Sequence, residues 1–382
     1  MPEFSLAALV AKFPWLILVS AAAIALGAVL VLTPLARRVG WTDKPSERKA
    51  HVGEIPLIGG WAVLLAMAVP QAVGPAEEVA PTGYWLAVSL LFVVALIDDR
   101  FPIRARYRFL VQIAAAVIGC SFGGQMLTGV GDLLGIGVLN HWWISLPVTI
   151  LGTVAVINAV NFTDGADGLC GGLGFIGLFW FLIAVALATS LAARSGEASL
   201  GYATSLIPLA AAMMGGLAGF LWFNLRSPWR AKAAVFLGDS GSMLIGFTLA
   251  WFAIHVASAY GAASVPPVVC LWIMAVPLAD SASCIVRRLL AGVKPTTPDL
   301  KHLHHLIIRL GWTPGQAVVL IHAGAFFCGL IGVGGWWLGI REHWLFAAFL
   351  VSLLVFISYT GYAWRRLDGE KVAEGATARL GA

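Results

Sequence analysis

Long apolar runs alternate with short polar segments along almost the whole chain of 382 residues. A helix needs about 20 consecutive, mainly apolar residues to cross a bilayer. Several of the runs contain Gly or Pro, which helices in lipid tolerate. The expected spans cover residues 15–35, 57–74, 79–97, 109–127, 142–158, 173–193, 202–225, 241–260, 264–286, 317–339 and 343–364. The pattern therefore predicts an all-α integral membrane protein with about eleven transmembrane helices.

Basic residues are distributed unequally between the two sets of loops that this partition creates. All but Lys12, Arg194 and Arg341 of the 24 Lys and Arg residues fall on one side. That side consists of residues 36–56, 98–108, 226–240, 287–316 and the segment after 364. Because basic loops stay in the cytoplasm, we expect the N-terminus outside and the C-terminus in the cytoplasm. We expect one catalytic transmembrane domain over 1–364 and a flexible cytoplasmic tail over 365–382.

The composition supports a membrane environment, since 60% of the residues are apolar and only 11% are charged, against about 25% in soluble domains. The net charge of +5 reflects topology and an attraction for anionic headgroups, so nucleic acid is not an expected partner. The five cysteines show no CxxC spacing. Neither a disulfide framework nor a zinc site is therefore predicted.

The first polar cluster is LIDDRFPIRARYR, residues 96–108. Asp98 and Asp99 end an apolar span, and four arginines follow. A carboxylate pair at a membrane surface can hold Mg²⁺ or steer a phosphate, and arginines suit an anionic lipid headgroup. The alternative is a solvated helix end.

The second cluster is NAVNFTDGADGLCGG, residues 158–172. Its side chains Asn158, Asn161, Asp164 and Asp167 recur every third residue, which places them on roughly one side of a helical turn. Four oxygen-bearing side chains in one wall can coordinate a hard cation and bind a sugar or ribose. The alternative is a polar loop with Asx-turns and helix caps.

The third cluster is VFLGDSGSMLIGF, residues 235–247, with Asp239 at the entrance of a helix. A single Asp in this position is either an N-cap or a metal ligand at a helix N-terminus that favours phosphate. Phe236 either stacks on a base or belongs to the core.

The fourth cluster is KPTTPDLKHLHHLIIRLG, residues 294–311, with His302, His304 and His305. No cysteine accompanies these histidines, and their spacing does not match zinc patterns. Histidines among lysines either bind a diphosphate or donate a proton to a leaving phosphate. The alternative is a solvated basic loop.

Asp280 lies inside an apolar span and is therefore a candidate for the functional site, unless it only pairs with Arg287 or Arg288. All of these clusters fall on the side assigned to the cytoplasm. Hard-cation ligands beside basic residues indicate a phosphate substrate, and the position at the bilayer surface indicates a lipid reactant. The chemistry expected is phosphoryl transfer from a soluble donor to a lipid acceptor.

The order of DDR, NAVNFTDGADGL, FLGDSGS and HLHH resembles the polyprenyl-phosphate N-acetylhexosamine-1-phosphate transferases, and residues 43–60 look like that family's first cytoplasmic loop. The resemblance spans about residues 40–315 and is closest to the WecA branch. The MraY branch has a third aspartate where this chain has Arg100. The departure argues against a UDP-MurNAc-pentapeptide donor.

The resemblance implies transfer of a sugar-1-phosphate, most simply GlcNAc-1-phosphate, from a UDP-N-acetylhexosamine to a polyprenyl (undecaprenyl) phosphate, with release of UMP. It implies the bacterial inner membrane, a cytoplasmic active site and a step in cell-envelope glycan (lipopolysaccharide, O-antigen) synthesis; a homodimer would fit. It also implies Mg²⁺, replaceable by Mn²⁺, bound by Asp239 with Asn161 as a second ligand. Asp98 and Asp99 would face the lipid phosphate, with Asp98 deprotonating or orienting it.

The same resemblance assigns the donor side. Asp164 and Asp167 would line the nucleotide-sugar pocket, with Phe236 beside the uracil. The three histidines would contact the diphosphate. The other residues expected to bind substrate are Asn158, Arg287, Arg288, Lys49, His51, Arg104 and Arg108.

Two other classes are weighed against this interpretation. A secondary transporter places ionisable residues near the midplane of the membrane, whereas these carboxylates gather at one face. A CDP-alcohol phosphotransferase is disfavoured because DGADGL lacks the arginine and later aspartates of that family's pattern. We favour direct attack by the lipid phosphate over a route through an aspartyl-phosphate.

Overall fold

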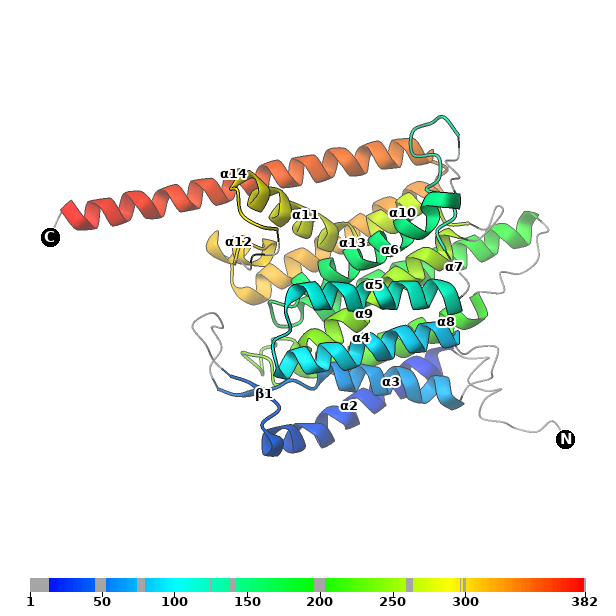
Figure 1. The fold of residues 1–382 in the computed structure, drawn as a ribbon, viewed down its shortest axis with the longest axis horizontal. Coiled ribbons are helices and arrows are strands. Elements are labelled where there is room, and N and C mark those ends of the chain that lie inside the picture. Colours follow the sequence, from blue (N-terminus) through cyan, green and yellow to red (C-terminus); the bar gives the residue numbers. More distant parts are fainter. Residues whose placement is uncertain are drawn as a thin grey trace.

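The computed structural model describes residues 14–44, 53–73, 80–123, 126–137, 142–195, 203–258, 264–295, 297 and 300–380. The described chain is almost entirely helical (Figure 1). Its helices are α2 (Pro14–Val39), α3 (Gly59–Val73), α4 (Thr82–Arg100), α5 (Ala105–Gly123), α6 (Trp142–Phe162), α7 (Leu169–Ser195), α8 (Ala203–Asn224), α9 (Gly238–Ala257), α10 (Pro267–Ile273), α11 (Ala275–Leu290), α12 (Leu303–Arg309), α13 (Pro314–Trp337) and α14 (Glu342–Leu380). A two-residue antiparallel pair, β1 (Thr42–Asp43) with β2 (Ile55–Pro56), precedes α3.

Each expected span overlaps a helix, and eight of the described helices are long and apolar enough to cross a membrane. The pair α10 and α11 passes the same test together but bends by 78° at Met274, and α3 is a shorter apolar helix. Helices satisfy their own backbone polar groups, which a bilayer cannot do. The finding confirms an all-α membrane protein.

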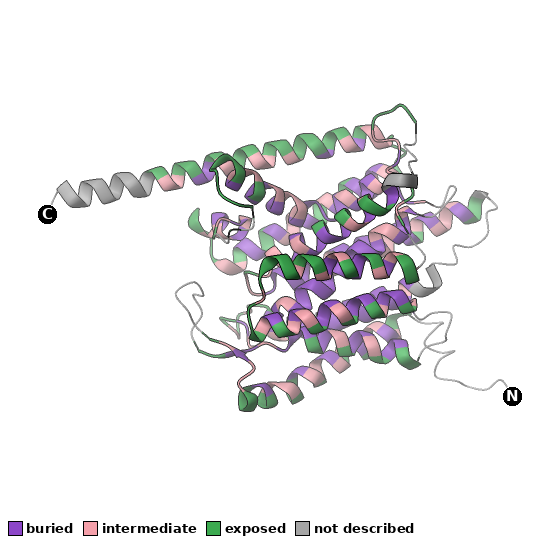
Figure 2. Ribbon diagram, viewed as in Figure 1, coloured by how far each residue is buried: buried purple, intermediate pink, exposed green. Residues whose placement is uncertain are grey.

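The outer surface of the bundle is apolar, as a lipid solvent requires. Val31 of α2 and Leu354 of α14 are 69% and 63% exposed. Figure 2 shows exposed residues along α2, α5 and α14, and mainly buried residues in the helices between them. The most buried span is α9, where 83% of the apolar window lies inside the protein.

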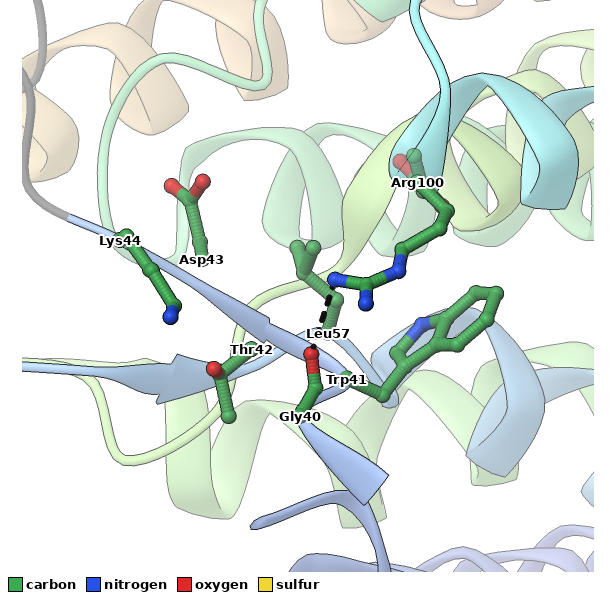
Figure 3. Close-up of a pocket in the computed structure, with 8 residues that line it drawn as sticks. Gly40, Trp41, Thr42, Asp43, Lys44, Leu57 and Arg100 are labelled. Carbon is green, nitrogen blue, oxygen red and sulfur yellow. Dashed lines mark hydrogen bonds between the residues drawn. The ribbon is translucent and has the colours of Figure 1, made fainter.

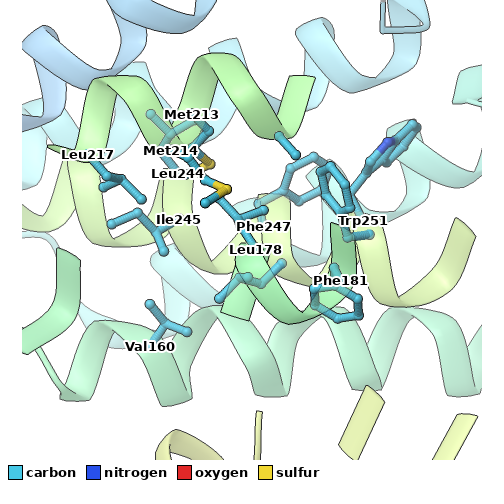
Figure 4. Close-up of a cluster of buried hydrophobic side chains, with 14 of the residues drawn as sticks. Val160, Leu178, Phe181, Met213, Met214, Leu217, Leu244, Ile245, Phe247 and Trp251 are labelled. Carbon is cyan, nitrogen blue, oxygen red and sulfur yellow. The ribbon is translucent and has the colours of Figure 1, made fainter. Parts of the chain in front are cut away.

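The core surrounds α9, which contacts α3, α4, α6 and α7. Its residues Leu244, Ile245, Phe247 and Trp251 belong to one buried cluster with side chains of α6, α7 and α8 (Figure 4). Because α9 lies in the centre, its N-terminal residues are surrounded by the ends of several neighbouring helices. These ends are at the left of Figure 1, together with β1 and α12.

Candidate active site

The N-terminus of α9 is capped by a carboxylate from another helix. Asp99, near the end of α4, accepts hydrogen bonds from the backbone N–H of Asp239 at 2.7 Å and of Ser240 at 3.3 Å, and from the Ser240 hydroxyl at 2.9 Å. The residue at the N-cap position, Leu237, offers no side-chain acceptor. Asp99 therefore satisfies donors that would otherwise be orphaned at the helix start. Both of its oxygens are occupied in this way.

Gly238 allows this approach of α4 to α9. Its φ of +78° is a backbone conformation that favours glycine. A Cβ atom at this position would lie 2.8 Å from Asp99 Oδ2. The glycine before the aspartate in FLGDSGS is thus required by the packing of Asp99.

Four helices bring one charged cluster together. Arg108 Nη1 of α5 lies 2.6 Å from Asp98 Oδ2 of α4 and 3.1 Å from Asp239 Oδ2 of α9. The amide nitrogen of Asn161, on α6, donates to Asp239 Oδ1 at 2.9 Å and to the Ser242 hydroxyl at 2.8 Å. The expected convergence of Asp98, Asp239, Asn161 and Arg108 is therefore present, although these residues come from segments up to 141 positions apart.

The donor atoms of this cluster fit a hard divalent cation. One cationic nitrogen, Arg108 Nη1, already lies within 3.1 Å of oxygens from both Asp98 and Asp239. The hydrogen bonds of Asn161 use its amide nitrogen and leave its carbonyl oxygen for a ligand. Two carboxylates and an amide oxygen are the ligand types that Mg²⁺ takes alongside phosphate and water.

Asp98 differs from its neighbour Asp99 in its contacts. Its side chain is 5% exposed, and it accepts a hydrogen bond from the backbone N–H of Ile103 at 2.5 Å in addition to the one from Arg108. It thus holds the turn between α4 and α5 together with the arginine. Arg104, in the same turn, is exposed to solvent.

Three of the four polar side chains of the second cluster contact three different elements. Asn158 exchanges hydrogen bonds with Gln112 of α5 at 2.6 and 3.4 Å. Asn161 contacts α9, and Asp167 accepts from Arg226 at 2.8 Å and from the backbone N–H of Ala233 at 3.2 Å. The helix ends at Phe162, and a turn with backbone hydrogen bonds from Thr163 to Val160 and from Asp164 to Asn161 follows.

Asp164 and Phe236 lie near these contacts in the turn after α6 and in the segment before α9. Asp164 is half-buried, and its backbone N–H donates to Asn161 at 3.1 Å. Phe236 is half-buried, and its backbone pairs with the first loop through Pro56 and Gly59, each at 2.9 Å. Lys49 and His51 lie outside the described residues.

A pocket of about 280 Å³ opens beside Asp99, between the first loop and the end of α4 (Figure 3). Its wall includes Trp41, Lys44 and Arg100. Arg100 donates to the carbonyl oxygen of Gly40 at 3.2 Å, so it ties the end of α4 to this loop.

The histidine segment lies against the turn that follows α6. The ring of His302 is 5.6 Å from that of Phe162, and it is nearly parallel to the ring of His304 at 6.1 Å. A Cβ atom at Gly165 would lie 2.8 Å from His304 Cε1 and Nε2. His305 is half-buried, with its ring 4.0 Å from His304.

The neighbouring histidines differ in charge. Burial, together with the charges of His305 and His302, lowers the pKa of His304 to about 3. Its Nε2 is buried without a hydrogen-bond partner among the described residues. For His302, burial lowers the pKa but the contacts with Asp280 and Cys284 outweigh it, raising the pKa to about 10. At neutral pH, His302 is therefore charged and His304 neutral.

The histidines do have a cysteine beside them, so that part of the sequence interpretation is wrong. Cys284 Sγ is 3.4 Å from His302 Nδ1, and these atoms lie within 4.8 Å of an Asp280 oxygen. However, Arg287 Nη2 is 3.0 Å from the same sulfur. A guanidinium in contact with the sulfur disfavours a second cation there, so we assign no metal to this group.

The two arginines at the end of α11 fix the following loop. Arg287 donates to the carbonyl oxygen of Lys301, and Arg288 donates to that of Pro295 at 2.7 Å. Arg287 Nη1 is buried and has no partner among the described residues. The sequence left open a pairing of Asp280 with Arg287 or Arg288. In the structure, Asp280 instead contacts His302 at 2.9 Å.

The last helix, α14, also reaches this loop. Lys301 Nζ is 2.5 Å from Asp368, and Arg309 Nη1 is 3.9 Å from it. Arg287, Lys301 and Arg309 lie over the ring of Trp364 at 5.1 to 5.8 Å. Part of the segment expected to be a flexible tail is thus held at Asp368.

Several residues of the site escaped the sequence interpretation. Asn224 accepts from the backbone N–H of Gly168 at 2.7 Å and donates to the carbonyl of Val235 at 2.8 Å, which joins the segments on either side of the site. Gln112, Arg226 and Ser242 make the contacts described above. A polar residue inside or at the end of an apolar span was the available signal for Gln112 and Asn224.

Comparisons with known proteins point in one direction. Residues 81–257 match glycosyl transferase family 4. Undecaprenyl-phosphate alpha-N-acetylglucosaminyl 1-phosphate transferase from Yersinia pestis is 34% identical over 338 residues, 88% of each chain. The proteins of the same name from Escherichia coli K12 and Pasteurella multocida are 33% and 35% identical, over 87% and 88% of this chain and 86% and 90% of theirs.

Proposed function

Because the chain belongs to glycosyl transferase family 4, among the undecaprenyl-phosphate alpha-N-acetylglucosaminyl 1-phosphate transferases, we propose that it transfers GlcNAc-1-phosphate from UDP-GlcNAc to undecaprenyl phosphate. The products are UMP and undecaprenyl-diphospho-GlcNAc, and the reaction is a first membrane step of cell-envelope glycan synthesis. The observation that carries the proposal is the convergence of Asp98, Arg108, Asn161 and Asp239 at one end of the membrane helices.

The reaction is a single displacement at phosphorus. An oxygen of the acceptor phosphate attacks the β-phosphorus of the donor, and the bond from that phosphorus to the bridging oxygen breaks. The bridging oxygen keeps the electron pair and leaves as part of UMP. Both reactants are anions, so catalysis consists mainly of positioning and of neutralising their repulsion.

Asp239 and Asn161 would hold Mg²⁺, for which Mn²⁺ could substitute, and the ion when bound would offset the charge of the donor's diphosphate. Arg108 offers a planar fork that suits a phosphate, and Asp98 holds this arginine at 2.6 Å. Since Asp98 is committed to Arg108 and Ile103, we assign it an orienting role rather than that of a base.

On the donor side, the histidines and Arg287 Nη1 are the groups available to the diphosphate. His302 keeps its proton at neutral pH because of its raised pKa, so it acts as a hydrogen-bond donor and not as a source of protons. Asp164, Asp167 and Phe236 would bind the nucleotide sugar. Lys49, His51 and Arg104 would bind substrate at the cytoplasmic surface.

The topology belongs to the proposal as well. We propose eleven spans in the bacterial inner membrane, with the N-terminus outside and both the active site and the C-terminus in the cytoplasm. The ends of α4, α6 and α9 that carry the cluster lie on the side of the basic loops, which supports this orientation. The same position at helix ends disfavours a transporter. A homodimer remains a prediction.

The test supplies purified protein with Mg²⁺, undecaprenyl phosphate and each UDP-sugar in turn. UMP and a lipid-linked product are expected with UDP-GlcNAc, and no product with any UDP-N-acetylhexosamine would contradict the proposal. Mass spectrometry of the protein after incubation with donor alone should find no covalent adduct. An enzyme-bound sugar phosphate or UMP would replace direct attack by a two-step route.

A further inference from the structure

Asp280 is a buried carboxylate that the proposed chemistry does not use. It lies within α11 and is 5% exposed. Its Oδ2 is 2.9 Å from His302 Nδ1, and its Oδ1 accepts the backbone N–H of Leu303 at 2.8 Å. Both oxygens are therefore directed at the start of α12, more than 20 residues later in the chain.

This contact fixes the position of His302. The residue is the N-cap of α12 and makes no side-chain cap of its own, and Asp280 satisfies the N–H of Leu303, one of the donors left unpaired at the start of a helix. The ring is confined on its other sides by Phe162 and His304. The contacts of the ring with Asp280 and Cys284 both use Nδ1, which leaves Nε2 for a substrate oxygen.

Asp280 is also the carboxylate that faces this ring. From α11 the ring meets Asp280 and Cys284, with Arg287 behind the sulfur at 3.0 Å. In its own segment, Lys301 is paired with Asp368 of α14, and His304 and His305 follow. The contact from α6 is the uncharged Phe162. The surrounding cations disfavour a charged imidazole, whereas the negative charge of Asp280 stabilises it.

We infer that Asp280 is a positioning residue, which fixes His302 through Nδ1 and keeps the ring protonated so that Nε2–H is presented to the phosphate oxygens of the donor. The inference rests on the proposed function. A carboxylate bonded to one ring nitrogen sets the orientation and charge of the other, as in other carboxylate–histidine pairs. A hydrogen bond from a charged donor to phosphate is shorter and stronger than a neutral one.

The first test compares the wild type with Asp280→Asn, which keeps the shape of the side chain and removes its charge. UMP release from UDP-GlcNAc is measured from pH 5.5 to 9.5. In the wild type, His302 has a pKa of about 10 and keeps its proton between pH 7 and 9, so its titration should not lower the rate in that range. In the variant, we expect His302 to have the ordinary histidine pKa of about 6.5, so that only about 1% of it is protonated at pH 8.5. The rate of UMP release should therefore fall by about 100-fold at that pH. Acidification should restore it.

Ser283→Ala is the matched control. Ser283 lies on the same helix, and its hydroxyl is 2.6 Å from that of Thr360 on α14, in a buried contact that does not involve the histidine. Its loss should lower the thermal stability and leave the pH profile unchanged. An equal loss of rate at every pH in Asp280→Asn, or no loss, would overturn the inference.

A second measurement does not depend on activity. In protein labelled with ¹⁵N-histidine, the resonances of His302 are assigned by their absence from His302→Gln. They should report two protonated ring nitrogens at pH 8 in the wild type and a neutral ring in Asp280→Asn. A neutral His302 in the wild type would refute the inference even if the enzyme transfers GlcNAc-1-phosphate, whereas absence of transfer with a charged His302 would refute only the proposed function.

Discussion

Asp99 of α4 accepts two hydrogen bonds from Ser240 of α9, one from its hydroxyl at 2.9 Å and one from its backbone N–H at 3.3 Å. Asp98 directly precedes Asp99 on α4, and Asp239 directly precedes Ser240 on α9. Because the cap holds Asp99 against Ser240, it also sets the distance between Asp98 and Asp239, the two carboxylates that share Arg108. In this way one aspartate of the DD pair holds the helix while the other belongs to the charged cluster.

Gly238→Ala tests this geometry. The new Cβ would lie 2.8 Å from Asp99 Oδ2, at a residue with φ of +78°. We expect a destabilisation of about 1–2 kcal/mol from the backbone alone and a severe loss of transfer, measured by thermal unfolding and UMP release. Gly315→Ala is the control, because no atom lies within 4 Å of its Cβ position. Equal behaviour of the two variants would contradict the role of the cap.

Arg108→Gln should leave Asp98 and Asp239 without the cation that separates them. Removing one partner from a buried ion pair costs several kcal/mol, and the partial exposure of Arg108, 29%, reduces this. We expect about a 100-fold loss of kcat/KM for undecaprenyl phosphate. Arg106→Gln on the same turn is the control, since Arg106 is exposed and contacts Tyr107. A wild-type rate in Arg108→Gln would remove the arginine from the mechanism.

Metal dependence can be measured by binding as well as by rate. EDTA should abolish UMP release, and Mg²⁺ or Mn²⁺ should restore it. Asp239→Asn should weaken Mn²⁺ binding, followed by electron paramagnetic resonance, by at least about tenfold, since even outer-shell partners contribute that much. Asp132→Asn should not, because Asp132 accepts the backbone N–H of Gly137 in the loop between α5 and α6. Unchanged Mn²⁺ affinity in Asp239→Asn would place the ion elsewhere.

His304 should make the fold sensitive to acid. Its pKa is lowered to about 3 by burial, so between about pH 3 and the ordinary value of about 6.5 the unfolded chain binds more protons. The free energy of unfolding should then fall on acidification, by up to about 1.4 kcal/mol per pH unit. His304→Gln should flatten this slope in thermal unfolding, whereas His305→Gln should retain it. An unchanged slope in His304→Gln would mean that another group causes the acid sensitivity.

Much of the architecture follows from the amino-acid sequence alone. Apolar runs of sufficient length have to be helical in lipid, because no other local structure satisfies the backbone there. The asymmetry of Lys and Arg predicts an orientation, and short polar segments such as DDR and FLGDSGS stand out against this background. These features are local, so they require no knowledge of which helices meet.

Only the tertiary structure decided which polar groups meet. Asp99 and Asp98 look alike in sequence, yet one caps α9 and the other holds Arg108. Asn158 and Asn161 share a helix, yet one contacts Gln112 and the other Asp239. Cys284 and His302 were separated by 18 residues and are in contact.

The physical reason is the solvent. A helix that is apolar on all faces carries little amphipathic signal, so its sequence does not state which face points inward. Rotation and tilt are set instead by packing against neighbours, at positions such as Gly238, where the absence of a side chain admits Asp99. The sequence thus determined the membrane fold and its polar segments, and packing determined which carboxylate, amide and histidine act together.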